Sequence, residues 1–544
     1  MTSTQNRRSI GGKPESLNTR PHSRSSSSTA SIPIETPSDT SPSTSPSPSF
    51  EILMEMHAQE HSGLAGELVK SETSGPETGR KSISTRKQSS PMMPAFMVSA
   101  PGKVIVFGEH AVVYGKAAIA ASISLRSYLL VTALSKSKRT VSLRFPDINL
   151  SHTWNIDDLP WDIFSQPGKK KYYYDRVTAL DPELLAAMKP HLADVSLDAP
   201  DDFRKVHQNS ASAFLYLLLS LGSPSFSGSI YTLRSTIPIG SGLGSSASIC
   251  VCLAASLLLQ LRTLSGPHPD QPSEEARLQI ERVNRWAFVG EMCIHGNPSG
   301  VDNTVAAQGK AVVYRRSDYS KPPSVSSLWN FPELPLLVVD TKQPKSTAFE
   351  VAKVAALQKS HPEITDSVVH AMDMVCEDAR KLISDDGFDS EELSSLEKLG
   401  KLMTINHGLL VALGVSHPRL ERIRELVDHE GIGWTKLTGA GGGGCAITLL
   451  KPEITRERMK RLEDSLEGEG YNQFVTMLGC DGVGVLWPAV LKNGSEDDEG
   501  GEEIDQDKFL NADGIEGVEA LVGVHGETGE DREAWKFWRV AQQE

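Results

Sequence analysis

Two glycine-rich stretches and two groups of charged residues in this sequence have the composition of a phosphate-handling site. In Pro238–Ser248, three glycines alternate with other residues, and serines precede the apolar run Ile249–Leu261. Glycine permits positive φ angles and close approach of a backbone to a ligand. Serines before an apolar run are typical of a helix N-cap. We therefore expect a tight loop whose amide groups converge at a helix N-terminus, a geometry that attracts phosphate. A structural turn with a good cap is the alternative.

This loop differs from two common nucleotide motifs. No lysine follows Gly244, so it is not a Walker A loop, and an acidic residue at the ribose-contact spacing of a dinucleotide fold is missing. If a triphosphate lies across the loop, Ser245 or Ser246 can offer a hydroxyl to its Mg²⁺, which prefers oxygen ligands.

Charged residues surround a glycine turn in Lys103–Lys116. An apolar strand there would deliver Lys103, Glu109 and His110 to a strand end, where rigid scaffolds place reactive side chains. A surface lysine next to a solvated turn would give the same pattern.

Two carboxylates, Glu291 and Asp302, are separated by a Gly/Pro turn. Such a turn can fold both back toward one cavity, where one would bind Mg²⁺ and the other would act on a hydroxyl. An ordinary acidic loop is the alternative.

A second glycine cluster lies in Lys436–Cys445. An unbroken glycine run is entropically costly in a plain loop. It suggests backbone packed close to a ligand or to the first loop.

The apolar pattern predicts the elements that hold these residues. We expect strands at Phe96–Ala100 and Lys103–Gly108, a strand at Ser227–Ser235 leading into the loop, and a helix at Ser273–Cys293. The second half predicts an α+β order of strands and helices. Its helices are expected at Thr347–Lys359, Asp366–Ile383, Leu393–Leu413, Pro418–Glu430 and from about Ile454, with strands at Leu336–Val339, Cys445–Leu450 and Val483–Leu486.

Composition divides the chain into four parts. We expect a disordered Ser/Thr/Pro-rich tail (1–92), an N-terminal domain (93–330), a C-terminal domain (331–488) and an acidic, mostly disordered tail (489–544). In the last part, a short helix near Glu533–Val540 either docks through Trp535 and Trp538 or hangs free.

Charge and cysteine content narrow the cellular context. The net charge of −14 argues against nucleic acid or an anionic membrane as a general partner. The six cysteines form no CxxC pair and no metal-ligand spacing, which favours a reducing, cytoplasmic compartment. No apolar run reaches the length of a membrane span.

Together, the four stretches resemble the GHMP kinases, and within them the mevalonate kinases. Pro238–Ser246 matches the phosphate-loop motif of the superfamily, and Lys436–Cys445 matches its C-terminal glycine motif. Lys103–Lys116 and Glu291–Asn303 resemble the mevalonate kinase versions. The resemblance covers about Ala95 to Trp487 and leaves both tails outside.

The resemblance implies an α+β fold of two domains, an N-terminal α/β domain and a C-terminal ferredoxin-like domain, with the site between them. It implies transfer of the γ-phosphoryl group of ATP to the 5-hydroxyl of (R)-mevalonate, with Mg²⁺ as cofactor. It also implies a homodimer and feedback inhibition by isoprenoid diphosphates.

Site residues carried over by the resemblance fall into four groups. Asp302 and Lys103 would be catalytic, and Ser246 and Glu291 would hold Mg²⁺. ATP would contact Lys103, Ser235, Gly240, Ser241, Gly242, Leu243, Gly244, Ser245 and Ser246. Substrate would contact Glu109, His110, Asp302 and Thr347. The C-terminal glycine motif is Gly439, Ala440, Gly441 and Gly442.

Two positions depart from the pattern of the animal mevalonate kinases. Asp147 stands where those enzymes have an asparagine near the adenine site, and Ile249 stands where they have a tyrosine near the substrate. A phosphomevalonate kinase would need extra basic residues near His110, and none is present there. A non-catalytic relative would be expected to lack Asp302 or Lys103.

Overall fold

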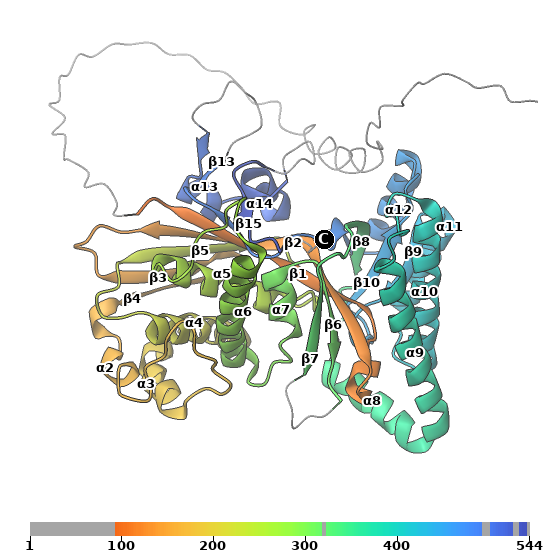
Figure 1. Cartoon of the computed structure of the whole chain (residues 1–544), viewed down its shortest axis with the longest axis horizontal. Coiled ribbons are helices and arrows are strands. Elements are labelled where there is room, and N and C mark those ends of the chain that lie inside the picture. The colour runs from red at the N-terminus through yellow and green to blue at the C-terminus, as the bar shows by residue number, and fades with distance from the viewer. Residues whose placement is uncertain (1–92, 318–322, 492–500, 526–531, 541–544) are drawn as a thin grey trace, which may run out of the picture. The chain divides into compact units, whose positions relative to one another are not determined.

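A thirteen-stranded sheet connects the two halves of the chain in this computed structural model (Figure 1). The structure describes residues 93–317, 323–491, 501–525 and 532–540, and all of them belong to one compact unit. The main path of the sheet, in spatial order, is β15 (Lys536–Phe537), β12 (Gly484–Leu486), β1 (Phe96–Phe107), β2 (Ala117–Ala133), β11 (Asn472–Leu478), β8 (Leu334–Asp340), β10 (Cys445–Leu450) and β9 (Gly433–Leu437).

The long strand β2 joins the halves because it pairs with several partners along its length. It runs antiparallel to β1 throughout, and its other edge pairs with β6 (Ala311–Arg315), with β11 at Leu478, and with β5 (Ser229–Ser235). Three further strands extend the sheet beyond β5 and β6. β3 (Thr140–Phe145) pairs with β5 and with β4 (Leu150–Asn155), and β7 (Ser324–Leu328) pairs with β6. The expected boundary near residue 330 therefore falls within a shared sheet.

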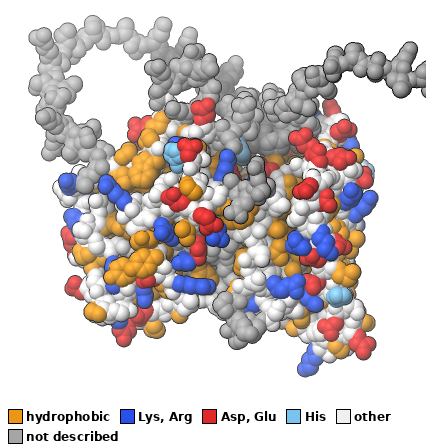
Figure 2. Space-filling view, in the orientation of Figure 1, with side chains coloured by type: hydrophobic (Ala, Val, Ile, Leu, Met, Phe, Trp, Pro, Cys, Tyr) orange, Lys and Arg blue, Asp and Glu red, His pale blue; other side chains and the backbone are white. Residues whose placement is uncertain are grey.

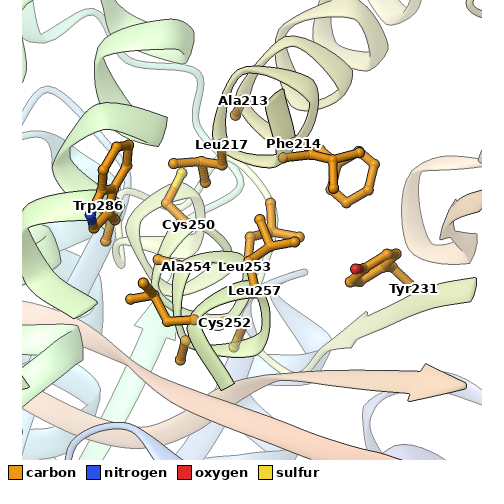
Figure 3. Packing of buried hydrophobic residues seen from close by; sticks show 14 of the residues in the cluster. Ala213, Phe214, Leu217, Tyr231, Cys250, Cys252, Leu253, Ala254, Leu257 and Trp286 are labelled. Atoms are coloured by element: carbon orange, nitrogen blue, oxygen red, sulfur yellow. The ribbon is translucent and has the colours of Figure 1, made fainter. Parts of the chain in front are cut away.

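Three helices of the N-terminal half pack on one face of the sheet: α4 (Asp201–Leu221), α5 (Ser245–Gln260) and α6 (Ser273–His295) (Figure 1). The middle helix, α5, is apolar on all sides and almost completely buried. Leu253 and Leu257 of α5 lie near Phe214 of α4, and Cys250 lies between Leu217 and Trp286 (Figure 3). Each large apolar side chain buried in this way contributes about 1.5–3 kcal/mol, so the packing holds the start of α5 firmly in place.

The C-terminal half surrounds β8, β9 and β10 with helices, as the α+β pattern predicts. They are α8 (Thr347–Ser360), α9 (Pro362–Ile383), α10 (Leu393–Ala412), α11 (Pro418–Glu430) and α12 (Arg456–Gly468). The structure confirms the predicted helices of this half, including the one from about Ile454, and the strand Cys445–Leu450. Several elements of the chain were not predicted, among them α2 (Trp161–Phe164), α3 (Pro182–Ala193) and β11.

The expected disorder of 489–544 is wrong for the residues described there. β13 (Val490–Leu491) pairs with β14 (Glu502–Glu503), and α13 (Gln506–Leu510) and α14 (Gly514–Val522) follow. Glu533–Val540 contains strand β15 instead of a helix, and both tryptophans are buried. The physical reason is that Met97, Tyr128 and Leu130 face away from α4–α6 and need apolar cover. The predicted tail 1–92 lies outside the described residues.

Surface charge is mixed on the face shown in Figure 2, where acidic and basic side chains are interspersed.

Within the described part of the chain, no helix combines the length and the apolar character needed to cross a membrane.

Candidate active site

The loop between β5 and α5 starts the site. Gly240, Gly242 and Gly244 all have positive φ angles, and Gly244 is the N-cap of α5. A serine cap was expected, but Ser245 is the first helical residue and α5 has no side-chain cap. A helix start without a side-chain cap presents its first amide N–H groups to a ligand. The start of α5, which lacks a side-chain cap, is therefore better suited to an anion than a capped helix would be.

Lys103 and Asp302 meet beside this loop, although they are distant in sequence. Lys103 Nζ lies 3.2 Å from Asp302 Oδ2 and donates a hydrogen bond to the Gly242 carbonyl oxygen at 3.3 Å. The Lys103 amide donates to the carbonyl of Leu243 at 2.8 Å, which ties β1 to the loop. Asp302 lies in the first turn of α7 (Val301–Gln308), where the helix dipole stabilises negative charge.

Glu291 lies near the end of α6, buried beside the same group. Burial raises its pKa to about 7, and the nearby Asp302 adds to the rise, while a hydrogen bond with Ser246 and the charge of Lys103 oppose it. Within the described part of the chain, Glu291 Oε1 is buried without a hydrogen-bond partner. A buried carboxylate oxygen of this kind is suited to a cation.

Sequence reasoning missed His295 as a member of this group. Its Nε2 lies 3.0 Å from Ser246 Oγ and 4.0 Å from Glu291 Oε1. The available signal was helical spacing, because residues four apart share a helix face. His295 is 52% exposed at its side chain, so it borders the site from the solvent side.

The second glycine cluster packs against the first loop, as one of the two readings of its sequence proposed. Cys445 Sγ donates to the Ser241 carbonyl oxygen at 3.6 Å. Gly441 and Gly442 have φ angles of +78° and +69°, and an added Cβ at Gly441 would lie 2.0 Å from a Val415 backbone oxygen. Only glycine fits there.

Lys345 lies between the two loops and was also missed. Its Nζ donates to the Ser241 carbonyl oxygen at 3.3 Å, and it lies 2.9 Å from where a Cβ on Gly242 would be. Burial lowers its pKa, and the charge of Lys103 lowers it further. Two cations therefore face the same loop. The signal was a lysine two residues before Thr347, a position that the resemblance had placed near the site.

The side chains of Glu109 and His110 have different partners. The Glu109 carboxylate is fully buried, where it pairs with Lys436 Nζ and accepts a hydrogen bond from Asn406 Nδ2 at 2.9 Å. The expected direct substrate contact of Glu109 is therefore not supported by this geometry. His110 Nε2 lies 2.8 Å from the Ala440 carbonyl oxygen, and its φ of 55° is rare outside glycine. His110 thus links the first strand turn to the second glycine cluster.

The remaining predicted residues lie at the ends of elements. Ser235 ends β5, its amide donates to Asp147 Oδ2 at 2.8 Å, and its hydroxyl accepts from the Ile237 amide at 3.2 Å. Asp147 also pairs with Arg234 at 2.7 Å. Thr347 is exposed in the first turn of α8, capped by Ser346.

Family comparisons agree with the fold. The family model "GHMP kinases N terminal domain" matches residues 209–310, and the model "GHMP kinases C terminal" matches residues 390–462. The first match includes the phosphate loop, Glu291 and Asp302. Both matches are to domains of the GHMP kinases, and they point to this class of protein.

Curated relatives narrow the class. A mevalonate kinase of Gibberella zeae is 70% identical over 86% of this chain and 92% of its own length. One of Aspergillus fumigatus is 66% identical over 87% of each chain, and one of Candida albicans is 42% identical over 81% of this chain and 99% of its own. This chain belongs to the mevalonate kinase family.

Proposed function

We propose that this chain transfers the γ-phosphoryl group of ATP to the 5-hydroxyl of (R)-mevalonate. The products are 5-phosphomevalonate and ADP, in an early step of isoprenoid and sterol biosynthesis. The observation that carries the proposal is the 3.2 Å contact of Lys103 with Asp302 beside an uncapped helix N-terminus. Family membership with the mevalonate kinases supports the choice of acceptor.

Asp302 would orient the mevalonate hydroxyl and accept its proton. Its neighbour Lys103, 3.2 Å away, holds the carboxylate beside the loop, where a hydroxyl can donate a hydrogen bond to it. The same Lys103 reaches the loop at Gly242, so its charge also stabilises the oxygens of the transferring phosphoryl group. Phosphoryl transfer depends mainly on such positioning and electrostatic stabilisation.

ATP would lie with its phosphates along Gly240–Ser245. The backbone amides of the loop and the start of α5 would bind the phosphate oxygens, and Lys345 would add a second positive charge. Ser235 would contact the nucleotide at the loop entrance. His110 would contact mevalonate, Glu109 would stay in its buried pair with Lys436, and the exposed Thr347 would border the site.

The residues present fit Mg²⁺. Glu291 offers a buried oxygen without a hydrogen-bond partner among the described residues, and Ser246 offers a hydroxyl next to it. No group of three His, Cys, Asp or Glu side chains suited to a metal is found in the described ranges. A site of few protein oxygens is characteristic of Mg²⁺, which retains several waters. When bound, the ion would neutralise phosphate charge.

A coupled ADP-release assay tests the substrate. The panel is mevalonate, phosphomevalonate, galactose and homoserine, each with Mg²⁺ and ATP. We expect mevalonate to be turned over first, and preference for any other member would refute the proposed acceptor. In the same assay, Asp302→Asn should lower kcat by about 10²–10⁴-fold while ADP still binds. Glu333→Gln, which breaks a remote ion pair with Lys310, is the matched control.

Three further properties are proposed from the family resemblance alone. The chain would form a homodimer, act in the cytoplasm, and be inhibited by isoprenoid diphosphates that compete with ATP. Light scattering in solution tests the first, imaging of the tagged chain the second, and inhibition kinetics at several ATP concentrations the third.

A further inference from the structure

The C-terminal segment 501–525 packs on the face of the sheet opposite to α4, α5 and α6 (Figure 1). Phe509 of α13 and Val522 of α14 are fully buried, in a cluster with Met97 and Tyr128 of the first two strands. The proposed reaction uses no residue of this segment. Its contacts nevertheless reach Arg234 and Thr236, which lie just before the phosphate loop.

The first contact comes from α13. Arg234 Nη1 donates to the backbone oxygens of Phe509 and Leu510 at 3.2 and 3.1 Å. These carbonyls belong to the last turn of α13, where a helix leaves its carbonyl oxygens without internal partners. The Arg234 side chain is almost fully buried, so the contact is not an incidental surface pairing.

The second contact continues from Arg234 toward the loop. Arg234 Nε donates to Asp147 Oδ1 at 2.7 Å, and Asp147 Oδ2 accepts from the Ser235 amide at 2.8 Å. The Ser235 hydroxyl accepts from the Ile237 amide at 3.2 Å. The line of hydrogen bonds thus runs from α13 to the residue before Pro238, where the loop begins. Asp147, a departure from the animal pattern, is the middle of this line.

The third contact comes from α14. Glu519 is half-buried and accepts hydrogen bonds from the Tyr128 hydroxyl at 3.1 and 3.2 Å. Its carboxyl also lies beside the side chain of Thr236, whose hydroxyl donates to the Arg126 carbonyl oxygen at 3.1 Å. Thus α13 contacts Arg234 and α14 lies beside Thr236, while Ser235 is reached through Asp147.

We propose that segment 501–525 positions the phosphate loop and thereby sets the affinity of the chain for nucleotide. Arg234 and Asp147 are positioning residues in this arrangement. Glycines make the loop itself conformationally permissive, so its placement depends on the strand that enters it. This proposal rests on the proposed function only in taking the loop as the nucleotide site.

Two full-length variants test the proposal at its two ends. Phe509→Ala loosens α13, and Arg234→Lys removes the forked guanidinium that bridges α13 and Asp147. We expect each variant to raise the Kd for a fluorescent ADP analogue, measured without mevalonate, by about tenfold, the effect of losing one charge-assisted hydrogen bond. KM for ATP should rise in parallel, and KM for mevalonate should stay unchanged.

Matched controls separate positioning from general loss of structure. Arg139→Lys disrupts a chemically similar bridge, in which a guanidinium joins Asp157 to the Phe226 carbonyl, far from the loop. Trp538→Phe removes another buried contact of the C-terminal region, its hydrogen bond to the Ser265 carbonyl oxygen. Both controls should leave nucleotide Kd unchanged even where they lower the unfolding midpoint.

The outcomes are distinct. If Phe509→Ala and Arg234→Lys lower the unfolding midpoint but leave nucleotide Kd at the control value, the segment is only a structural cover and the proposal is overturned. Equal rises in KM for ATP and for mevalonate would overturn it as well. Failure of the proposed function would appear differently, as an unsubstituted chain that binds ADP but phosphorylates no member of the panel.

Discussion

Lys345 is the side chain whose contribution is easiest to isolate, because the same segment supplies a control. It lies between both glycine loops, and Lys342, three residues earlier, is exposed. We expect Lys345→Met to lower kcat by about 10²-fold, as the loss of one preorganised donor does in other enzymes. Lys342→Met should leave kcat unchanged. Lys345→Arg, which keeps the charge, should recover part of the rate in the same steady-state assay.

Equal losses in the two methionine variants would contradict a role for Lys345 at the phosphates. So would a change confined to KM for mevalonate. A result of either kind would make Lys345 a packing residue that fills the space beside Gly242 and Gly444.

Glu291 gives the metal-free chain a defined pH dependence. Its pKa is about 7 in the folded state, against an ordinary value of 4.5, because burial disfavours the charged form. Between these values the unfolded chain holds fewer protons than the folded chain, so stability falls as pH rises through this window. In Glu291→Gln this pH dependence should vanish. The parent chain should therefore lose about 3 kcal/mol of unfolding free energy by pH 8 that the variant keeps.

Urea unfolding at several pH values in the presence of a chelator measures this effect. If the variant and the parent keep parallel slopes between about pH 4.5 and 7, the buried carboxylate is not the group responsible. The same variant should lose Mg²⁺-dependent activity. The Glu291 carboxylate would then both lower stability at high pH and hold the metal ion during the reaction.

At the scale of elements, the junction of loop and helix at Gly244 is the most sensitive point. Gly244 has a φ of +81°, and an added Cβ would lie 2.9 Å from Lys103 Cγ. We expect Gly244→Ala to cost about 1–3 kcal/mol of stability from backbone strain and to lower turnover by displacing Lys103. Gly168→Ala has the same backbone strain at φ +83° with no atom within 4 Å. Thermal unfolding and kcat of both variants separate strain from displacement.

Turnover in Gly244→Ala equal to that in Gly168→Ala would mean that Lys103 moves without consequence. The comparison works because the two glycines share a conformation and differ only in what surrounds them.

Elements with strong local signals were predictable from the sequence. The helix Pro418–Glu430 and the strand Cys445–Leu450 have the predicted ends, because proline and glycine mark the limits of the helix and a continuous apolar run defines the strand. The C-terminal segment was not predictable, because its composition is acidic and its few apolar residues give no clear pattern. These residues become buried by packing on the sheet face that contains Met97 and Tyr128.

The sequence predicted those site residues that stand in short, recognisable motifs. Lys103, Glu291 and Asp302 were found from the residues around them, and the structure brings them together. The burial of Glu109 was not predictable, because its partners Lys436 and Asn406 lie some three hundred residues away and no local pattern connects them.

At the scale of the molecule, the shared sheet implies that the two halves unfold together. β2 carries partners from both halves, and one buried cluster combines Ile119 and Ile123 of β2 with Leu336 and Ile447 of the C-terminal strands. Separating the halves would expose this cluster and break the pairing of β2 with β11 at Leu478. We therefore expect a single cooperative transition for the described part of the chain in calorimetry.

Nucleotide provides the second half of that test. Because ADP would bind only the folded chain, ADP at a hundred times its Kd should add about 2.7 kcal/mol and shift the whole transition upward. The shift should include the C-terminal half, even though the phosphate loop belongs to the N-terminal half. Two resolved transitions, of which ADP moves only one, would contradict this expectation and show that the halves are energetically independent despite their common sheet.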